Sequence, residues 1–302
     1  MESRFKVHSK SVISPLRYPG SKQKLVPYIE RILTFNCLSP DTIIEPFAGG
    51  SSMTLSLLTR GIVNNAIISD SDPLINAFWS VLFKEPLILI DFIEKVPVNL
   101  KSFYKFKEIS RKPKAFSKYD RAKSCLFLNR TSFSGIIASA AGPIGGHEQK
   151  SEYTIDCRFN RTALIEKIEY ISTFKKQIIV MSSDWKKAIS YAQHKYDERK
   201  KSKKLFFYLD PPFYHKAESL YQTYFKLGQH DELAKYLKKF RAMWILSYDN
   251  TPEIKKLYAA HSGKSLHIEM PYSINSHAKR NASELIITPL KLPHSLSRIK
   301  GT

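Results

Sequence analysis

Short apolar runs that end in polar or proline-containing turns recur along the chain. Three of them are rich in β-forming residues and begin near residues 42, 177 and 205, with the sequences TIIEPF, QIIVMS and LFFYLD. Buried parallel strands have this composition because both of their faces are covered. Two further runs, AMWILSYDN and SELIITPL, follow late in the chain. We expect all five runs to be strands.

Segments with helical periodicity separate several of these runs. Residues 51–59 form one such segment, which Gly61 ends, and residues 231–240 form another. Strands that alternate with helices build βαβ units and a parallel sheet. The pattern therefore predicts an α/β fold with a doubly wound, mostly parallel, Rossmann-like sheet.

The region from Phe83 to Arg161 interrupts this alternation, because it is longer than a crossover between strands requires. Within it, residues 101–123 contain nine basic residues and two acidic ones. We interpret the region as an inserted, mainly helical subdomain that faces a nucleic acid. The charge run taken by itself fits a solvated helical face equally well.

The charge of the whole chain favours a polyanionic partner. The 302 residues include 48 Lys and Arg against 27 Asp and Glu, a formal net charge of +21. Nucleic acid is the first candidate, and a Lys-rich soluble protein or a protein at a membrane surface are the alternatives. No stretch approaches the roughly 20 apolar residues of a membrane-spanning helix, and the first residues lack the apolar run of a signal peptide. We therefore expect a cytoplasmic protein without a membrane partner.

The cysteine and histidine residues give no sign of a metal site. Cys37, Cys125 and Cys157 are odd in number and far apart, and the nine His residues show no ligand spacing. Both a disulfide framework and a zinc cluster are disfavoured by this arrangement. We assign no metal to the chain.

A glycine turn follows the first predicted strand. Gly49 and Gly50 lie in the run EPFAGGSS, where the backbone can turn tightly and approach a ligand closely. The run AIISD ends in Asp70, at the spacing where an acidic residue can accept hydrogen bonds from ribose hydroxyl groups. The GxGxxG fingerprint of dinucleotide sites is absent. S-adenosyl-L-methionine fits these features, because it has ribose and adenine but no phosphate.

A second motif follows the apolar run LFFYL and consists of Asp210, Pro211, Pro212 and Phe213. Open α/β sheets place their chemistry at this end of a strand. The prolines have fixed φ angles and no N–H groups, so their carbonyl groups are free to face a ligand. A carboxylate and a carbonyl can each accept a hydrogen bond from one N–H group of adenine's exocyclic amine. These two bonds make the nitrogen lone pair available for attack on a sulfonium methyl group. We interpret the motif as a catalytic turn on which Phe213 stacks against a base that is rotated out of the duplex.

These motifs, in this order, resemble those of the Dam-type (D12 class, alpha-order) adenine-specific DNA methyltransferases over nearly the whole chain. The resemblance rests on LRYPGSK at residues 16–22, EPFAGGS at 45–51, DSDP at 70–73, LNRTSFSG at 128–135, DPPF at 210–213, ILSYDN at 245–250 and the ELI strand at 284–286. It implies a catalytic domain of residues 1–82 and 162–302 that binds S-adenosyl-L-methionine, and a target-recognition subdomain of residues 83–161.

The resemblance also implies roles for individual residues. The catalytic residues would be Asp210, Pro211, Pro212 and Phe213. The residues at the methyl donor would be Tyr18, Lys22, Phe47, Gly49, Gly50, Asp70, Asp184 and Asp210. DNA would be bound by Asn129, Arg130, Thr131, Lys112 and Lys114, although Arg130 beside a Ser-Gly turn also fits a local helix cap.

Two positions depart from the family pattern, which usually has Trp where Tyr18 stands and Tyr where Phe213 stands. Both changes keep an aromatic face, so stacking is expected to persist. The missing phenol at residue 213 removes one hydrogen bond, and cytosine's amine therefore stays open as a target.

The resemblance implies site-specific transfer of a methyl group to the N6 amine of a flipped adenine in double-stranded DNA of a prokaryotic or phage-infected cell. A cognate restriction endonuclease that shares the site is a conceivable partner. The alternatives are an RNA amino-methyltransferase and a non-catalytic DNA-binding relative. The PGSK segment ahead of the glycine motif disfavours the first, and the intact Lys22, Asp70 and Asp210 disfavour the second.

Overall fold

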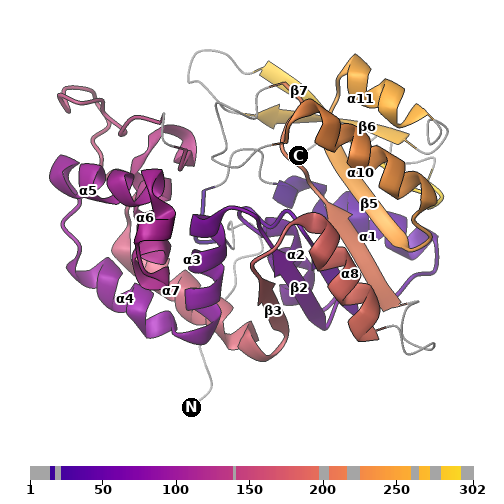
Figure 1. The fold of residues 1–302 in the computed structure, drawn as a ribbon, viewed down its shortest axis with the longest axis horizontal. Helices are drawn as coiled ribbons and strands as arrows, with labels where there is room; N and C mark the ends of the chain where they lie inside the picture. Colours follow the sequence, from indigo (N-terminus) through magenta and orange to yellow (C-terminus); the bar gives the residue numbers. More distant parts are fainter. Residues whose placement is uncertain are drawn as a thin grey trace.

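The centre of the molecule is one seven-stranded sheet in the order β3-β2-β1-β4-β5-β7-β6 (Figure 1). The computed structural model describes residues 14–17, 22–138, 141–196, 204–215, 225–259, 265–272 and 280–293, with the backbone alone at 227, 265–272 and 280–283. The strands are β1 (Thr42–Glu45), β2 (Asn65–Ser69), β3 (Ile178–Met181), β4 (Leu205–Leu209), β5 (Met243–Asp249), β6 (Ser265–Tyr272) and β7 (Arg280–Ile287). Strands β1 to β5 run parallel, and β7 is antiparallel to β5 and β6. The predicted α/β class and mostly parallel sheet are confirmed.

Both faces of the sheet are buried. Successive residues of a strand point to opposite faces, so Ile43, Phe206 and Ile245 enter one hydrophobic core while Ile44 and Phe207 enter a second. This double burial explains why the strands read as continuous apolar runs. All five predicted runs form strands, whereas β6 was not predicted.

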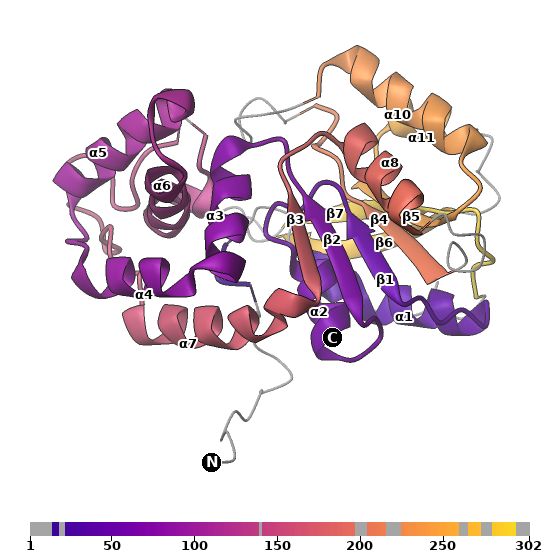
Figure 2. The same cartoon turned by 60° about the horizontal axis from the view of Figure 1, so that its bottom comes forward.

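Helices supply the other half of each core, and Figure 2 shows the sheet between them. The first face is covered by α1 (Val26–Phe35) and α2 (Ser52–Thr59), and the second by α8 (Trp185–Tyr196), α10 (Leu227–Lys239) and α11 (Pro252–Leu257). Helix α2 ends before Gly61, whose φ of +67° lies in the left-handed region, as the sequence predicted. Helix α10 begins earlier than predicted.

A group of helices lies beside the β3 edge of the sheet (Figures 1 and 2). It consists of α3 (Pro73–Lys84), α4 (Pro86–Lys95), α5 (Leu100–Arg111), α6 (Lys118–Thr131) and α7 (Arg161–Ser172). Single 3₁₀ turns are η1 (Lys22–Leu25), η2 (Pro113–Ala115), η3 (Phe133–Gly135) and η4 (Thr173–Lys176). Phe103 and Phe127 inside this group belong to the same core as the first face of the sheet. Its separation as a target-recognition subdomain therefore stays a prediction.

Side-chain caps fix where the helices of this group begin. Asp72, Asn99, Ser117 and Asn160 each accept a hydrogen bond from a backbone N–H group in the first turn of α3, α5, α6 and α7. Within the described residues, no single helix is long and apolar enough to cross a membrane. Helices α3 and α4 reach that length and composition only as a pair, which is bent by 107°.

Candidate active site

The carboxyl ends of β1, β2 and β4 border a cavity of about 240 Å³. Parallel α/β sheets bind their ligands at the carboxyl ends of their strands. The predicted site residues that line the cavity are Lys22, Phe47, Gly49, Gly50, Asp70, Asp184, Asp210 and Pro212. The structure thus brings the glycine motif and the proline motif, which are far apart in sequence, to one cavity.

The glycine turn forms one wall of this cavity. Gly49 has a φ of +44° and Ser51 a φ of +48°, both in the left-handed region that glycine adopts without strain. The N–H group of Gly49 donates a 2.8 Å hydrogen bond to Oδ2 of Asp70. The ring of Phe47 packs edge-on against Phe225, with centroids 5.4 Å apart. The turn is therefore fixed to the end of β2 and to a second aromatic wall.

Asp70 follows β2 and is partly exposed to the cavity. Its two oxygens accept hydrogen bonds from backbone N–H groups, Oδ2 from Gly49 and Oδ1 from Asp72 at 2.9 Å. Burial, and then the neighbouring Asp72 carboxylate, raises the pKa of Asp70 to about 7. A carboxyl group held in this way has a fixed orientation, which suits the recognition of paired hydroxyl groups.

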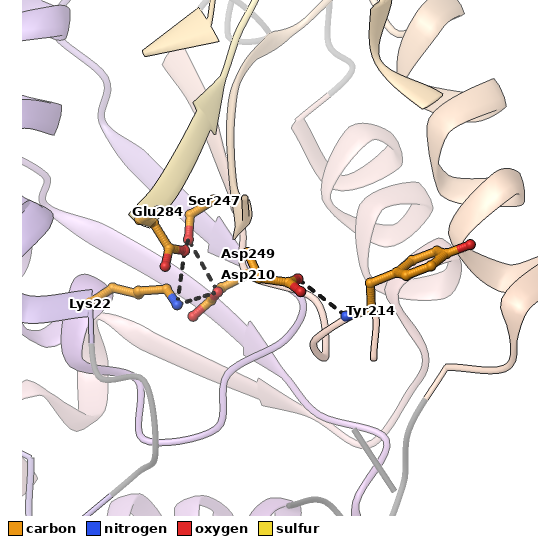
Figure 3. Close-up of polar contacts among 6 residues, drawn as sticks. All are labelled: Lys22, Asp210, Tyr214, Ser247, Asp249 and Glu284. Atoms are coloured by element: carbon orange, nitrogen blue, oxygen red, sulfur yellow. Dashed lines mark hydrogen bonds and ion pairs between the residues drawn. The ribbon is translucent and has the colours of Figure 1, made fainter. Parts of the chain in front are cut away.

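Asp210 follows β4 and belongs to a cluster with Lys22, Ser247 and Glu284 (Figure 3). Lys22 Nζ lies 3.2 Å from Asp210 Oδ1 and 3.0 Å from Glu284 Oε1. Ser247 Oγ lies 3.2 Å from the same Asp210 oxygen and 2.8 Å from Glu284 Oε1. Burial raises the pKa of Asp210, the Lys22 ammonium opposes this shift, and Glu284 adds to it. The Asp210 side chain keeps 26% of its surface exposed, against 4% for Lys22 and 1% for Glu284, so Asp210 is the accessible member of the cluster.

The residues after Asp210 are fixed at both ends of the turn. The ring of Phe213 is partly exposed and its centroid lies 5.4 Å from Lys22 Nζ, within range of a cation–π contact. The N–H group of Tyr214 donates a 3.2 Å hydrogen bond to Asp249 Oδ1, at the end of β5 (Figure 3). Burial raises the pKa of Asp249.

The remaining predicted residues of this site differ in their placement. Pro211 is buried, whereas Pro212 lines the cavity. Asp184 lines the cavity as an exposed residue, and its Oδ1 accepts a 3.0 Å hydrogen bond from the N–H group of Lys187 at the start of α8. Tyr18 lies outside the described residues. Within the described ranges, no group of three or more His, Cys, Asp or Glu residues is arranged to hold a metal ion.

Two buried acids at this edge, Glu45 and Glu284, receive no role from the sequence motifs. Glu45 lines the cavity and accepts hydrogen bonds from the Ser51 hydroxyl at 2.8 Å and the Thr54 N–H group at 3.3 Å. Burial raises its pKa to about 8. Each acid stands alone in an apolar strand, TIIE or ELII. That pattern is a usable signal, because a buried carboxyl group requires partners.

Two of the residues expected to contact DNA lie inside the protein. Asn129 is fully buried, donates to the carbonyl groups of Arg17 and Gly135 at 2.7 and 2.9 Å, and accepts from the Arg17 N–H group at 2.6 Å. Thr131 is also fully buried, and its hydroxyl donates to Phe127 O within α6. Side chains without exposed surface do not reach a DNA ligand, so the structure corrects the expected contact for both. Asn129 instead fastens the segment ahead of η1 to η3.

The three other expected DNA contacts are accessible to different extents. Arg130 is partly exposed and its guanidinium donates to the carbonyl group of Pro15, while burial lowers its pKa to about 10. Lys112 and Lys114 are exposed, and Lys112 forms a surface ion pair of 3.1 Å with Glu108. Their role in DNA binding stays a prediction.

The fold and the acidic edge of the sheet define a Rossmann-like methyltransferase class of protein. The family model for the D12 class N6 adenine-specific DNA methyltransferases matches residues 18–274, and the chain belongs to this family. No curated protein matches the chain. The resemblance expected from the motifs is therefore confirmed, and the family supports methylation of adenine in DNA.

Proposed function

We propose that the chain transfers a methyl group from S-adenosyl-L-methionine to the N6 amine of a specific, flipped adenine in double-stranded DNA, in the cytoplasm of a prokaryotic or phage-infected cell. The observation that carries this proposal is that Asp70 and Asp210 line the same cavity. Asp70 suits the ribose of the donor, and Asp210 suits the amine of the target. A direct transfer requires both substrates to meet in one enclosed space with the reacting atoms aligned.

The lining of the cavity fits the methyl donor, which supplies its methyl group from a positively charged sulfonium. The described lining carries six carboxyl groups against the ammonium groups of Lys22 and Lys186, and this excess of acidic groups favours a cation over a phosphate. The backbone at Gly49 would allow a close approach of the donor. Asp70 would accept hydrogen bonds from its ribose, and Asp184 from its adenine.

The Asp210 carboxylate would receive the target amine. Lys22 and Ser247 both contact Oδ1, so the orientation of the carboxylate is set before a substrate binds. We infer that Asp210 accepts a hydrogen bond from one N–H group of the amine and that the carbonyl group of Pro211 accepts a hydrogen bond from the other. The nitrogen lone pair is then directed at the methyl group, and the partly exposed ring of Phe213 stacks on the base.

The helical group at the β3 edge would hold the DNA. In this proposal residues 83–161 form the target-recognition subdomain, with Lys112, Lys114 and Arg130 at phosphate groups. Rotation of a base out of the duplex costs a few kcal/mol, which such contacts would offset. A cognate endonuclease as partner stays a prediction of the family resemblance.

A labelling experiment tests the proposed reaction. The protein is incubated with methyl-labelled donor and either plasmid DNA or total RNA, and the product is digested to nucleosides. We expect label in N6-methyldeoxyadenosine from the wild type and none from Asp210→Ala, which should still bind DNA. Label confined to RNA would assign an RNA substrate, and label in N4-methyldeoxycytidine would assign cytosine. A complete absence of label would favour a non-catalytic DNA-binding protein.

A further inference from the structure

Glu284 lies on β7, far in sequence from the glycine turn and from the Asp210 turn, but in the same cluster as Asp210. In the antiparallel pairing of β5 and β7, Glu284 is opposite Asp249 and Ile286 is opposite Ser247. Because alternate residues share a face, Glu284 lies on the same face as Ile286, which belongs to the first core. Leu25 of the η1 turn belongs to this core too, and Lys22 at the start of η1 contacts Glu284. The register of the sheet therefore places a carboxylate beneath the Lys22 ammonium.

One ammonium group serves two carboxylates in this cluster. Lys22 Nζ lies at 3.0 Å from Glu284 and at 3.2 Å from Asp210. If Glu284 were absent, the positive charge of Lys22 would fall on Asp210 alone and would hold its carboxylate as a neutral pair. Because Lys22 also pairs with Glu284, the two most buried members of the cluster neutralise each other, and the negative charge stays on the accessible Asp210.

We propose that Glu284 is a positioning residue: it holds the Lys22 ammonium and thereby keeps Asp210 available to accept the proton that the target amine loses. This inference rests on the proposed methyl transfer. Glu284 also lies beyond residue 274, where the family match ends. Glu284 is not among the described residues that line the cavity. It therefore acts through its contacts with Lys22 and Ser247.

The proton balance of the reaction shows why this matters. The amine nitrogen forms a bond to the methyl carbon while the carbon–sulfur bond breaks and leaves its electron pair on sulfur. The methylated nitrogen then carries one hydrogen too many and must release a proton to give a neutral product. Asp210 accepts this proton and passes it to water, and a more basic carboxylate accepts it more readily.

The other charged and titratable groups that face Asp210 come from several elements. Besides Lys22, Glu284 and the Ser247 hydroxyl, electrostatic interactions with Asp210 arise at Glu45, Tyr208 and Tyr248. Burial raises the pKa of each of these three groups, so at neutral pH they stay largely uncharged. Among the residues whose side chains the structure describes, Lys22 and Glu284 are therefore the charged neighbours that set the proton affinity of Asp210.

The first test is a titration of the whole protein without methyl donor or DNA. The carboxyl carbons of Asp are labelled with ¹³C, and the Asp210 signal is assigned as the one missing in Asp210→Asn. In Glu284→Gln the amide oxygen still accepts from Lys22, but the negative charge is lost. We expect the measured pKa of Asp210 to fall by about one pH unit. An unchanged pKa would overturn the inference.

Ser247→Ala provides a matched variant with the opposite sign. The Ser247 hydroxyl lies at 3.2 Å from Asp210 and lowers its pKa, so removal of the hydroxyl should raise the measured value. General loosening of the cluster would move both variants in the same direction, and that result would contradict the inference. If Glu284→Gln does not fold, Glu284→Asp replaces it. The shorter side chain places its carboxylate farther from Lys22, so the measured pKa of Asp210 should fall, but by less than in Glu284→Gln. A pKa equal to that of the wild type would overturn the inference.

The second test is the pH profile of turnover. Asp210 must be ionised to accept a proton, so the acidic limb of kcat should shift to lower pH in Glu284→Gln, while kcat on the plateau falls roughly three- to tenfold. A purely structural role would lower the thermal midpoint and the plateau without moving the limb. Wild-type protein that transfers no methyl group contradicts the proposed function. Active wild type with an unmoved limb in Glu284→Gln contradicts only the role of Glu284.

Discussion

Trp79 Nε1 donates a 2.9 Å hydrogen bond to the carbonyl oxygen of Gly49. This bond joins α3 of the helical group to the glycine turn of the candidate active site. The indole is 1% exposed and stacks on Phe83 with ring centroids 5.9 Å apart. The N–H group of Gly49 is meanwhile bound to Asp70. The carbonyl group of Gly49 is thus hydrogen-bonded to α3, and its N–H group is hydrogen-bonded to the residue that follows β2. The shape of the turn therefore depends on α3.

Substitution Trp79→Phe should therefore weaken both the fold and the donor site. The change leaves the carbonyl group of Gly49 without this donor and opens space in the core, and we expect a loss of about 2 kcal/mol in the free energy of unfolding. The dissociation constant of the methyl donor should rise roughly tenfold, since 1.4 kcal/mol of lost binding is a factor of ten. Urea unfolding and titration calorimetry measure the two effects.

Phe78→Leu is the matched control for Trp79→Phe, because Phe78 is fully buried in the same helix and has no hydrogen bond to the turn. It should lower stability and leave donor affinity within about twofold. Equal affinity losses in the two variants would show that the Trp79–Gly49 bond has no particular effect on the site.

The buried Glu45 predicts a pH-dependent stability. Burial raises its pKa from 4.5 to about 8 in the folded protein, so between these values the folded chain holds a proton that the unfolded chain releases. Stability from this group is complete below pH 4.5 and is lost as the pH rises through 8. Glu45→Gln keeps an acceptor for Ser51 and Thr54 but carries no titrating proton. The variant should gain on the wild type by a few kcal/mol between pH 5 and pH 8.

Unfolding by urea at several pH values tests this expectation. Glu166→Gln serves as the control, because Glu166 is an exposed acid on α7. Its difference from the wild type should be the same at each pH. If the difference in unfolding free energy between Glu45→Gln and the wild type is also independent of pH, Glu45 is ionised in the folded protein throughout the range.

Asp210→Asn should reduce the single-turnover rate of methyl transfer by at least about 100-fold, the usual effect of removing one aligned polar group from a reacting centre. The amide retains the size of the side chain, and Lys22 keeps Glu284 as a partner. DNA binding, measured by fluorescence anisotropy, should therefore persist. Asp249→Asn makes the same chemical change at a carboxylate that accepts from the Tyr214 N–H group and does not line the cavity as described, and should cost less than about tenfold. Similar losses in both variants would remove the special role of Asp210.

The parts of the fold that could be predicted from sequence are those encoded over a few neighbouring residues. A strand covered on both faces is an apolar run, and this signal identified β1, β3, β4, β5 and β7. The glycine and proline turns are equally local. Among the described strands, β6 lies at the edge of the sheet and pairs with β7. Its sequence SLHIEMPY mixes polar and apolar residues, and no continuous run marks it.

The pairings between distant residues could not be predicted. Glu284 reads as one acid in a strand until the sheet places it against Lys22. Asn129 stands in a segment that resembles a DNA contact, yet its partners Arg17 and Gly135 draw it into the interior. Lys107 counts toward the basic run, but it is buried and donates to the carbonyl groups of the segment that follows η3. Net charge along a sequence does not reveal which side chains face solvent.

The exposed lysines after α5 predict a change in the salt dependence of DNA binding. Lys112 and Lys114 should each release counterions from one phosphate group, so replacing both with Gln should reduce the slope of log K against log salt by about 1.8. Affinity should fall similarly for all DNA sequences, because phosphate contacts carry no base information. Lys175 and Lys176 are the matched control, since both are exposed in η4 just before β3. They lie at the amino-terminal ends of the parallel strands, whereas the cavity lies at the carboxyl ends. Replacing that pair should leave the slope nearly unchanged, and equal slopes for the two pairs would place the DNA on another face of the molecule.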